Sequence, residues 1–353
     1  MTDAERPVLV STDGRLGRIT LNRPRAINAL TLEMIRLIDE ALTAWEGDDA
    51  VACVLLDGAG ERGLCAGGDV ILMRDSALAT DRTPVMDFWR EEYRLNARIA
   101  SYGKPIVAVL DGVVMGGGVG LAAHASHAVV TERVRFAMPE VGIGFTPDVG
   151  GTFLLSRAPG ELGTHLALTG ASVGAGDVLA CGFARSFLAA EEVDEVAAAL
   201  VTGADVPTVL TAASMRSGEI PGSTLEEGRD WIDECYAGDD AAQIVARLRE
   251  RPETGAHAAA DLVERQSPTS VAVTLAALRR AAALDSLEEC LEHEWATSLA
   301  FLDTPDFVEG IRAAVVDKDR SPTWSPPALA TVPQAEIARH LGPLPDGVPP
   351  LFG

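Results

Sequence analysis

The sequence predicts an α/β protein with a helical C-terminal region, and two observations on its 353 residues lead to that class. Short apolar runs alternate with amphipathic helical patterns up to about residue 190, as is typical of α/β folds. Beyond that point the pattern is almost entirely helical. The composition change therefore predicts a core over residues 1–190, a helical region over 191–320 and a proline-rich, extended tail over 321–353.

The individual elements follow from their local patterns. Strands are expected at 8–10 and 15–21, around the turn Asp13-Gly14. Thr31 is suited to cap a helix that runs to Trp45, because apolar residues recur there at helical spacing. Further strands are predicted at 52–56, 106–110, 126–131 and 134–137, and further helices at 84–101, 162–169, 175–181, 191–200, 225–236, 241–249, 271–284, 287–302 and 306–315.

Charge and cysteine usage exclude several classes of protein. The net charge is -23 and no Lys/Arg cluster forms a basic face, so we expect no nucleic-acid partner. The most apolar stretch, 106–123, contains Asp111 and five glycines, which favours a buried strand, turn and helix over a membrane span. Five scattered cysteines and an N-terminus without a secretory signal predict a cytoplasmic protein.

Two glycine clusters directly after predicted strands are the first candidates for a functional site. They are Gly67-Gly68 and Gly116-Gly117-Gly118. Glycine lets backbone N–H groups approach a ligand closely, and two such groups aimed at one point can stabilise an oxyanion. Tight turns or close helix packing would explain the glycines equally well. Neither cluster matches the GxGxxG fingerprint with its following acidic residue, so a dinucleotide site is disfavoured.

Two carboxylates, Glu140 and Asp148, lie eight residues apart in an otherwise apolar, glycine-rich segment. A carboxyl group in apolar surroundings has a raised pKa and is suited to act as an acid, a base or a nucleophile. The alternative is a pair of surface-loop carboxylates, which the apolar neighbours disfavour. Glu91 and Glu92 fit the solvated face of a helix. The six histidines have no metal-ligand spacing, so we expect no metal site.

Several motifs, in this order, resemble the crotonase (enoyl-CoA hydratase/isomerase) superfamily. They are NRP at 22–24, NAL at 28–30, CAGGD at 65–69, MGGGVG at 115–120, FAMPEVGIGFTPDVGG at 136–151 and ALTG at 167–170. Four further motifs are similar to its 3-hydroxyisobutyryl-CoA hydrolase branch, so that the resemblance covers about residues 8–327. These are FWREEYRLN at 88–96, KPIVAVLDGVVMGGGVGL at 104–121, SPTSVAVTL at 267–275 and FVEGIRAAVVDKDRSPTW at 307–324.

The resemblance implies a spiral of ββα units followed by a helical C-terminal region. It also implies that the N–H groups of Gly68 and Gly117 form an oxyanion hole for a thioester carbonyl. Residues that line the substrate in the hydrolase branch match Glu92, Gly117, Glu140 and Asp148. Candidate contacts for coenzyme A are Arg25, Ala66 and Lys318.

One departure from the hydratase pattern bears on the reaction. Enoyl-CoA hydratases carry a glutamate three residues after the oxyanion-hole glycine, where this chain has Gly120, and commonly a glycine where it has Asp148. The resemblance therefore implies hydrolysis of an acyl-CoA thioester, namely 3-hydroxyisobutyryl-CoA of valine catabolism, with Glu140 as nucleophile or general base. The alternatives are an enoyl-CoA hydratase/isomerase and a non-catalytic acyl-CoA-binding protein. Coenzyme A is part of the substrate, no other cofactor is expected, and the family resemblance suggests a homo-oligomer, a trimer or a hexamer.

Overall fold

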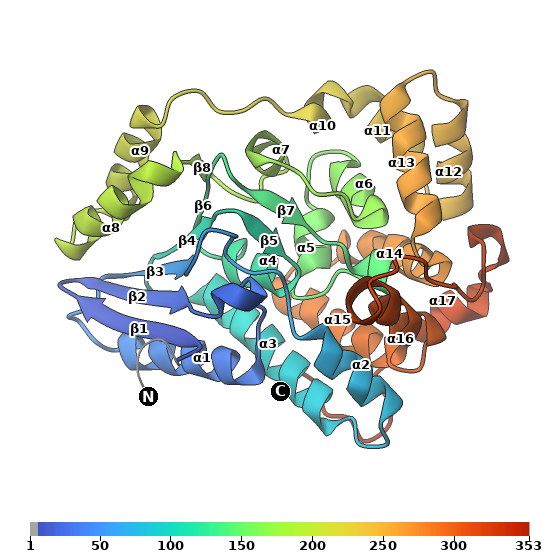
Figure 1. The fold of residues 1–353 in the computed structure, drawn as a ribbon, viewed down its shortest axis with the longest axis horizontal. Helices are drawn as coiled ribbons and strands as arrows, with labels where there is room; N and C mark the ends of the chain where they lie inside the picture. The colour runs from blue at the N-terminus through green and yellow to red at the C-terminus, as the bar shows by residue number, and fades with distance from the viewer. Residues whose placement is uncertain (1–5, 353) are drawn as a thin grey trace. The chain divides into compact units, whose positions relative to one another are not determined.

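The computed structural model describes residues 6–352, which group into two compact units. Unit 1 contains residues 6–68, 94–136 and 173–224, and unit 2 contains residues 69–93, 137–172 and 225–352. Both units are assembled from segments that are distant in the sequence, as the colours of Figure 1 show. The long helix α3 (Thr83–Ser101) begins in unit 2 and ends in unit 1.

Unit 1 is built on a six-stranded sheet with the strand order β1-β2-β3-β4-β6-β8. The edge strand β1 is antiparallel to β2, and every other neighbouring pair is parallel. A second, two-stranded sheet pairs β5 with β7. The strands are β1 Val8–Asp13, β2 Leu16–Leu21, β3 Cys53–Gly58, β4 Ile106–Leu110, β5 Val113–Met115, β6 His127–Val130, β7 Arg135–Ala137 and β8 Ser186–Phe187.

Helices of unit 1 bury the faces of this sheet. Thr31 caps α1 (Leu32–Glu46) by accepting a hydrogen bond from the Met34 N–H, as its sequence pattern predicts. The helices α8 (Val193–Val201) and α9 (Val206–Arg216) pack on the side chains of β2, β3, β4 and β6 in one hydrophobic cluster. The other short helices of unit 1 are η2 Pro24–Ala26, α4 Gly117–Ala122, α7 Ala175–Ala180 and η4 Ala190–Glu192.

Unit 2 is helical. Its buried aromatic centre stacks Trp89 on Phe145, with ring centroids 5.4 Å apart, and places Phe307 and Phe301 against Phe145. The helices after α3 are η3 Glu140–Ile143, α5 Gly151–Leu155, α6 Leu162–Thr169, α11 Arg229–Tyr236, α12 Ala241–Glu250, α13 Thr254–Arg265, α14 Pro268–Ala281, α15 Leu287–Phe301, α16 Pro305–Ile311, the π-helix η5 Arg312–Val316, η6 Leu329–Thr331 and α17 Gln334–His340. The helix α2 (Val70–Leu78) precedes them, and α10 (Thr224–Glu227) begins where unit 1 ends.

The predicted α/β class is confirmed, while single elements differ from expectation. The helices α2, α5, α9 and α13 were not among those predicted, and the tail contains the helix α17 where an extended chain was expected. Near the C-terminus Leu351 is buried and the Phe352 N–H donates a hydrogen bond to Glu292 at 2.7 Å. The boundaries at residues 190 and 320 divide the sequence by its composition, whereas the two units divide the structure by compactness. These two boundaries therefore stay predictions. No helix among residues 6–352 has the length and apolar character that a membrane span requires.

Candidate active site

The two glycine clusters of unit 1 meet where β5 ends and α4 begins. The Cys65 N–H donates to the Val113 carbonyl and the Met115 N–H donates to the Cys65 carbonyl, both at 3.0 Å, so the two segments run side by side. Gly116 turns the chain into α4 with a φ of 48°, a conformation that favours glycine. A Cβ on Gly118 would lie 2.6 Å from the Cys65 carbonyl oxygen. Turn geometry and close packing therefore account for Gly116 and Gly118.

Unlike Gly116 and Gly118, Gly68 and Gly117 have backbone N–H groups without a hydrogen-bond partner among the described residues. Gly117 is the first residue of α4, so its N–H has no partner inside the helix. Within the described residues, neither the Gly117 nor the Gly68 N–H donates a hydrogen bond to the protein. A Cβ on Gly67 would lie 4.0 Å from the Gly117 nitrogen, so the two clusters are adjacent in space. The junction therefore holds, in neighbouring segments, two N–H groups without a protein partner among the described residues.

Unit 2 brings the three predicted carboxylates into one buried cluster. Glu92 comes from α3, Glu140 begins η3, and Asp148 lies in the loop before α5, with exposed fractions of 1%, 7% and 6%. One oxygen each of Glu92 and Glu140 is buried without a hydrogen-bond partner among the described residues. Buried polar atoms are almost always hydrogen-bonded in folded proteins, so these two oxygens are suited to receive a polar ligand.

Burial and mutual repulsion set the protonation of this cluster. Burial raises the pKa of Glu92 well above its usual range, and the charges of Asp148 and Glu140 raise it further. Burial, with the charge of Asp148, likewise raises the pKa of Glu140 well above its usual range. Burial raises the pKa of Asp148 to about 7, although a hydrogen bond from Tyr93 opposes this. A carboxyl group with a pKa of about 7, as Asp148 has, can exchange protons near neutral pH.

Two residues that sequence reasoning did not identify bind Asp148 or the loop after it. The Tyr93 hydroxyl donates to Asp148 Oδ2 at 2.7 Å and lies 2.8 Å from the Ser298 hydroxyl. Glu294 on α15 accepts hydrogen bonds from the backbone N–H groups of Gly150 and Thr152, two and four residues after Asp148. Neither role has a local sequence signal, because the partners are 55 and 144 residues apart in the chain.

The candidate contacts for coenzyme A are divided between the units. Arg25 and Ala66 are exposed in unit 1, where the Ala66 N–H donates to the Ile27 carbonyl at 3.0 Å and so lies near Arg25. Lys318 is exposed in unit 2. The structure thus brings Arg25 close to Ala66 and assigns Lys318 to the other unit. Within residues 6–352 no group of three His, Cys, Asp or Glu side chains is arranged to hold a metal ion.

Comparison with known proteins identifies relatives along nearly the whole chain. A family model described as enoyl-CoA hydratase/isomerase matches residues 16–341. The mitochondrial 3-hydroxyisobutyryl-CoA hydrolase of Danio rerio is 40% identical over 333 residues, which cover 92% of this chain and 86% of the relative. These matches include the glycine junction of unit 1 and the carboxylate cluster of unit 2.

Two solved structures share the fold of this chain, but their names give activities other than the hydrolase activity of the curated relatives. The crystal structure of a carnitinyl-CoA dehydratase from Mycobacterium thermoresistibile is 49% identical, with a TM-score of 0.92 over 97% of this chain and 98% of that chain. The crystal structure of an enoyl-CoA hydratase from Rhodobacter sphaeroides is 42% identical, with a TM-score of 0.90 over 96% and 98%. Shared architecture therefore does not by itself select one reaction.

The predicted cytoplasmic location is wrong, because the curated relatives are mitochondrial proteins. The prediction depended on the five scattered cysteines, which contain no CxxC pair, and on the lack of a secretory pattern. These two features cannot distinguish between compartments inside a cell that keep thiols reduced.

Proposed function

The chain belongs to the enoyl-CoA hydratase/isomerase family, and from that membership we propose that it hydrolyses the acyl-CoA thioester 3-hydroxyisobutyryl-CoA. The predicted crotonase-like fold is confirmed by the same membership and by the TM-score of 0.92. The observation that carries the proposal is the pair Glu140 and Asp148 in one buried cluster, in a chain that has Gly120 where hydratases carry their first glutamate. The names of the curated relatives support the same activity.

The proposed mechanism requires both groups of residues to act on one thioester. The N–H groups of Gly68 and Gly117 would receive the carbonyl oxygen and stabilise its negative charge in the tetrahedral transition state. Glu140 would either attack the carbonyl carbon, giving a mixed anhydride that water then cleaves, or take a proton from an attacking water. In both routes the C–S bond breaks and coenzyme A leaves as a thiol after gaining one proton.

The remaining site residues would select and orient the substrate. The fixed carboxylate of Asp148 is suited to accept a hydrogen bond from a 3-hydroxyl group, and the unpartnered oxygen of Glu92 to shape the acyl pocket. Arg25, Ala66 and Lys318 would contact coenzyme A. Hydrolysis consumes only water, so the proposal includes no further cofactor. It also includes a role in valine catabolism and, from the family resemblance, assembly into trimers or hexamers, which light scattering would test against the 37.0 kDa chain mass.

The decisive measurement is release of free thiol from 3-hydroxyisobutyryl-CoA by the wild-type protein and by Glu140→Gln. Gln keeps the size of the side chain but can neither attack nor accept the proton. We expect thiol release to fall at least ~100-fold, the scale on which a general base contributes. A Glu140→Gln variant as active as the wild type would remove Glu140 from the mechanism.

A second candidate is reversible hydration of an enoyl-CoA, which the names of the two solved structures favour. The loss of enoyl-thioester absorbance from crotonyl-CoA, followed in parallel with thiol release, separates the two reactions. Rapid loss of absorbance without free thiol would establish the second candidate. Tight binding of acyl-CoA without turnover in either assay would instead indicate a non-catalytic binding protein.

A further inference from the structure

We infer that Glu294 is a positioning residue, whose carboxylate fixes the backbone from Gly150 to Thr152 and thereby the direction of the Asp148 side chain. The inference rests on the proposed function, which places Asp148 against the substrate. Glu294 belongs to α15, whereas Asp148 lies in the loop before α5, and both are in unit 2. Nothing in the sequence motifs links the two residues.

The hydrogen bonds of Glu294 all lead to this loop. Its Oε2 accepts from the Gly150 N–H at 2.6 Å, and its Oε1 accepts from the Thr152 N–H at 2.9 Å and from the Thr152 hydroxyl at 2.5 Å. The side chain is only 2% exposed, and in the described part of the chain it forms no ion pair. Three donors thus converge on one carboxyl group that has no other hydrogen-bond partner among the described residues. Burial raises its pKa to about 8, whereas these three hydrogen bonds favour the ionised form, in which such bonds are short and strong.

The loop between Asp148 and Gly150 needs such a restraint. Val149 has a φ of 54° and Gly150 a φ of 78°. A β-branched residue seldom adopts the left-handed region, and it stays there only when its surroundings impose the conformation. The Gly151 N–H closes the turn with a 2.6 Å bond to the Asp148 carbonyl. The bonds from Glu294 hold the backbone immediately after the unfavourable residue.

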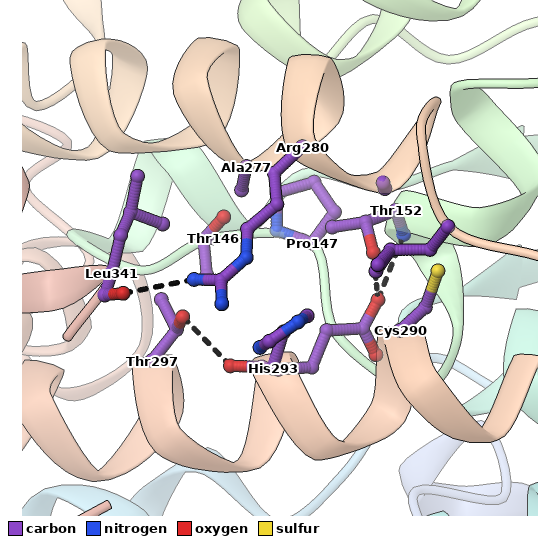
Figure 2. Close-up of a pocket in the computed structure, with 12 residues that line it drawn as sticks. Thr146, Pro147, Thr152, Ala277, Arg280, Cys290, His293, Thr297 and Leu341 are labelled. Atoms are coloured by element: carbon purple, nitrogen blue, oxygen red, sulfur yellow. Dashed lines mark hydrogen bonds between the residues drawn. The ribbon is translucent and has the colours of Figure 1, made fainter. Parts of the chain in front are cut away.

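A cavity of about 10 Å³ lies between the loop, α14 and α15, and Pro147 and Thr152 line it. Figure 2 shows Arg280, Cys290 and Thr297 around the same cavity. This volume holds about one water molecule. The hydrogen bonds from Glu294 to Gly150 and Thr152 hold the loop beside this cavity.

Asp148 is therefore held at two points. The Tyr93 hydroxyl fixes its carboxylate at 2.7 Å, and Glu294 fixes the backbone two residues later. Loss of the backbone restraint would let Val149 relax to an ordinary conformation and would turn the Asp148 carboxylate away from Tyr93. A small displacement of a group that acts on substrate reduces the rate of the chemical step more than it reduces binding.

The test compares Glu294→Gln with the wild type in the thiol-release assay. Gln keeps one acceptor oxygen but presents an NH₂ group to a backbone donor. We expect kcat to fall ~10–100-fold, with a much smaller change in KM. Thr152→Val removes one of the three donors without altering the charge, and we expect about a 3- to 10-fold loss of kcat. Thr152→Ser keeps the hydroxyl and should retain near wild-type kcat.

Asp306→Asn is the matched control, because Asp306 is another fully buried carboxylate of unit 2 that accepts bonds from the Ser267 hydroxyl and the Ser325 N–H. It should lower stability while the folded protein keeps its kcat. The inference is overturned if Glu294→Gln retains kcat within two-fold, or if Asp306→Asn loses kcat to the same extent. A Thr152→Ser variant no more active than Thr152→Val would also contradict it.

Failure of the inference can be distinguished from failure of the proposed function. If the wild type releases thiol and Glu294→Gln does so equally fast, only the positioning role fails. If the wild type turns over no thioester, hydrogen exchange of the Gly150 and Thr152 amides still tests the restraint. Exchange at least ~10-fold faster in Glu294→Gln supports it, and unchanged exchange overturns it.

Discussion

The three candidate carboxyl groups share a buried region of unit 2 with Glu294, and these groups affect the charge that one another can carry. Burial raises the pKa of Glu92, Glu140 and Asp148, and the charge of Asp148 raises the other two further. Like charges in one buried site cannot all ionise together at neutral pH. Asp148 alone accepts a hydrogen bond from a neutral hydroxyl, which favours its ionised form. Asp148 is therefore expected to ionise first as the pH rises.

The activity of the wild type should depend on pH through Asp148. If its carboxylate must accept a hydrogen bond from the substrate, kcat/KM rises with pH through about 7, the pKa of this group. Asp148→Asn removes the titration, so its kcat/KM should be low and should lack this rise. A pH profile of thiol release for both proteins checks this. A variant that keeps the same rise would assign it to another group.

Ionisation of Asp148 as the pH rises should lower the stability of the folded protein while it raises the activity. The pKa of Asp148 is raised from 3.8 to about 7 in the folded protein, so between these values the folded state binds more protons than the unfolded state. Its contribution to stability is present below pH 3.8 and is lost as the pH rises through about 7. We expect the stability of Asp148→Asn relative to wild type to increase with pH in this window, by at most ~1.4 kcal/mol per pH unit. Urea unfolding at several pH values measures this difference.

Site residues could be predicted from the sequence only where the neighbouring residues indicate that a side chain is buried. Glu140 and Asp148 are in an apolar, glycine-rich segment, so their burial could be expected from their neighbours. Glu92 follows another glutamate on an amphipathic helix, and only the family resemblance singled it out. Tyr93 and Glu294 could not be found, because their roles depend on tertiary contacts to the Asp148 loop.

At the scale of elements, the junction of β5 and α4 is where a strand, a turn and a helix must approach one another closely. Gly118 lies against the backbone of Cys65, and a Cβ there would meet the Cys65 carbonyl oxygen at 2.6 Å and its Cβ at 2.8 Å. Backbone atoms cannot move aside as a flexible side chain can. The close approach also brings the Gly67-Gly68 segment beside the start of α4.

Gly118→Ala should therefore destabilise the protein by roughly 1–3 kcal/mol, the usual cost of overpacking. Thiol release should fall as well, because the shift would separate the N–H groups of Gly68 and Gly117. Gly103→Ala is the matched control, since no atom lies within 4 Å of the added Cβ. Denaturant unfolding of both variants measures the difference. Equal stability of the two variants would show that α4 can move away from Cys65 without cost.

The helices that were predicted have clear local signals, whereas α2 and α17, which were not, lack a recognisable apolar face or follow a segment that predicts extended chain. The helix α1 has a side-chain cap and a clear apolar face, and its bounds agree with the prediction to within one residue. In α2 the sequence VILMRDSAL places apolar residues consecutively, so no helical face can be recognised. The helix α17 follows a proline-rich segment that predicts extended chain, yet its His340 is wholly buried. In α17, tertiary burial overrides local preference.

At the scale of the whole molecule, the dominant property is charge. The chain has 52 acidic and 29 basic residues, which gives a net charge of -23. A field of one sign repels ligands of the same sign, and salt screens it. The screening length falls from about 30 Å at 10 mM salt to about 8 Å at 150 mM. The proposed substrate carries the phosphate groups of coenzyme A, so it approaches a protein of like charge.

We therefore expect kcat/KM for 3-hydroxyisobutyryl-CoA to rise with ionic strength from 10 to 150 mM, by up to roughly 10-fold, with kcat unchanged. The control substrate is the N-acetylcysteamine thioester of the same acid, which reacts at the same carbonyl but carries no phosphate. Its kcat/KM should not respond to salt, because the field of the protein does not act on a neutral molecule. Should kcat/KM for the coenzyme A thioester fall with salt instead, local attraction by basic residues would outweigh the net charge. Arg25→Ala and Lys318→Ala would then abolish that fall if these side chains contact the phosphates.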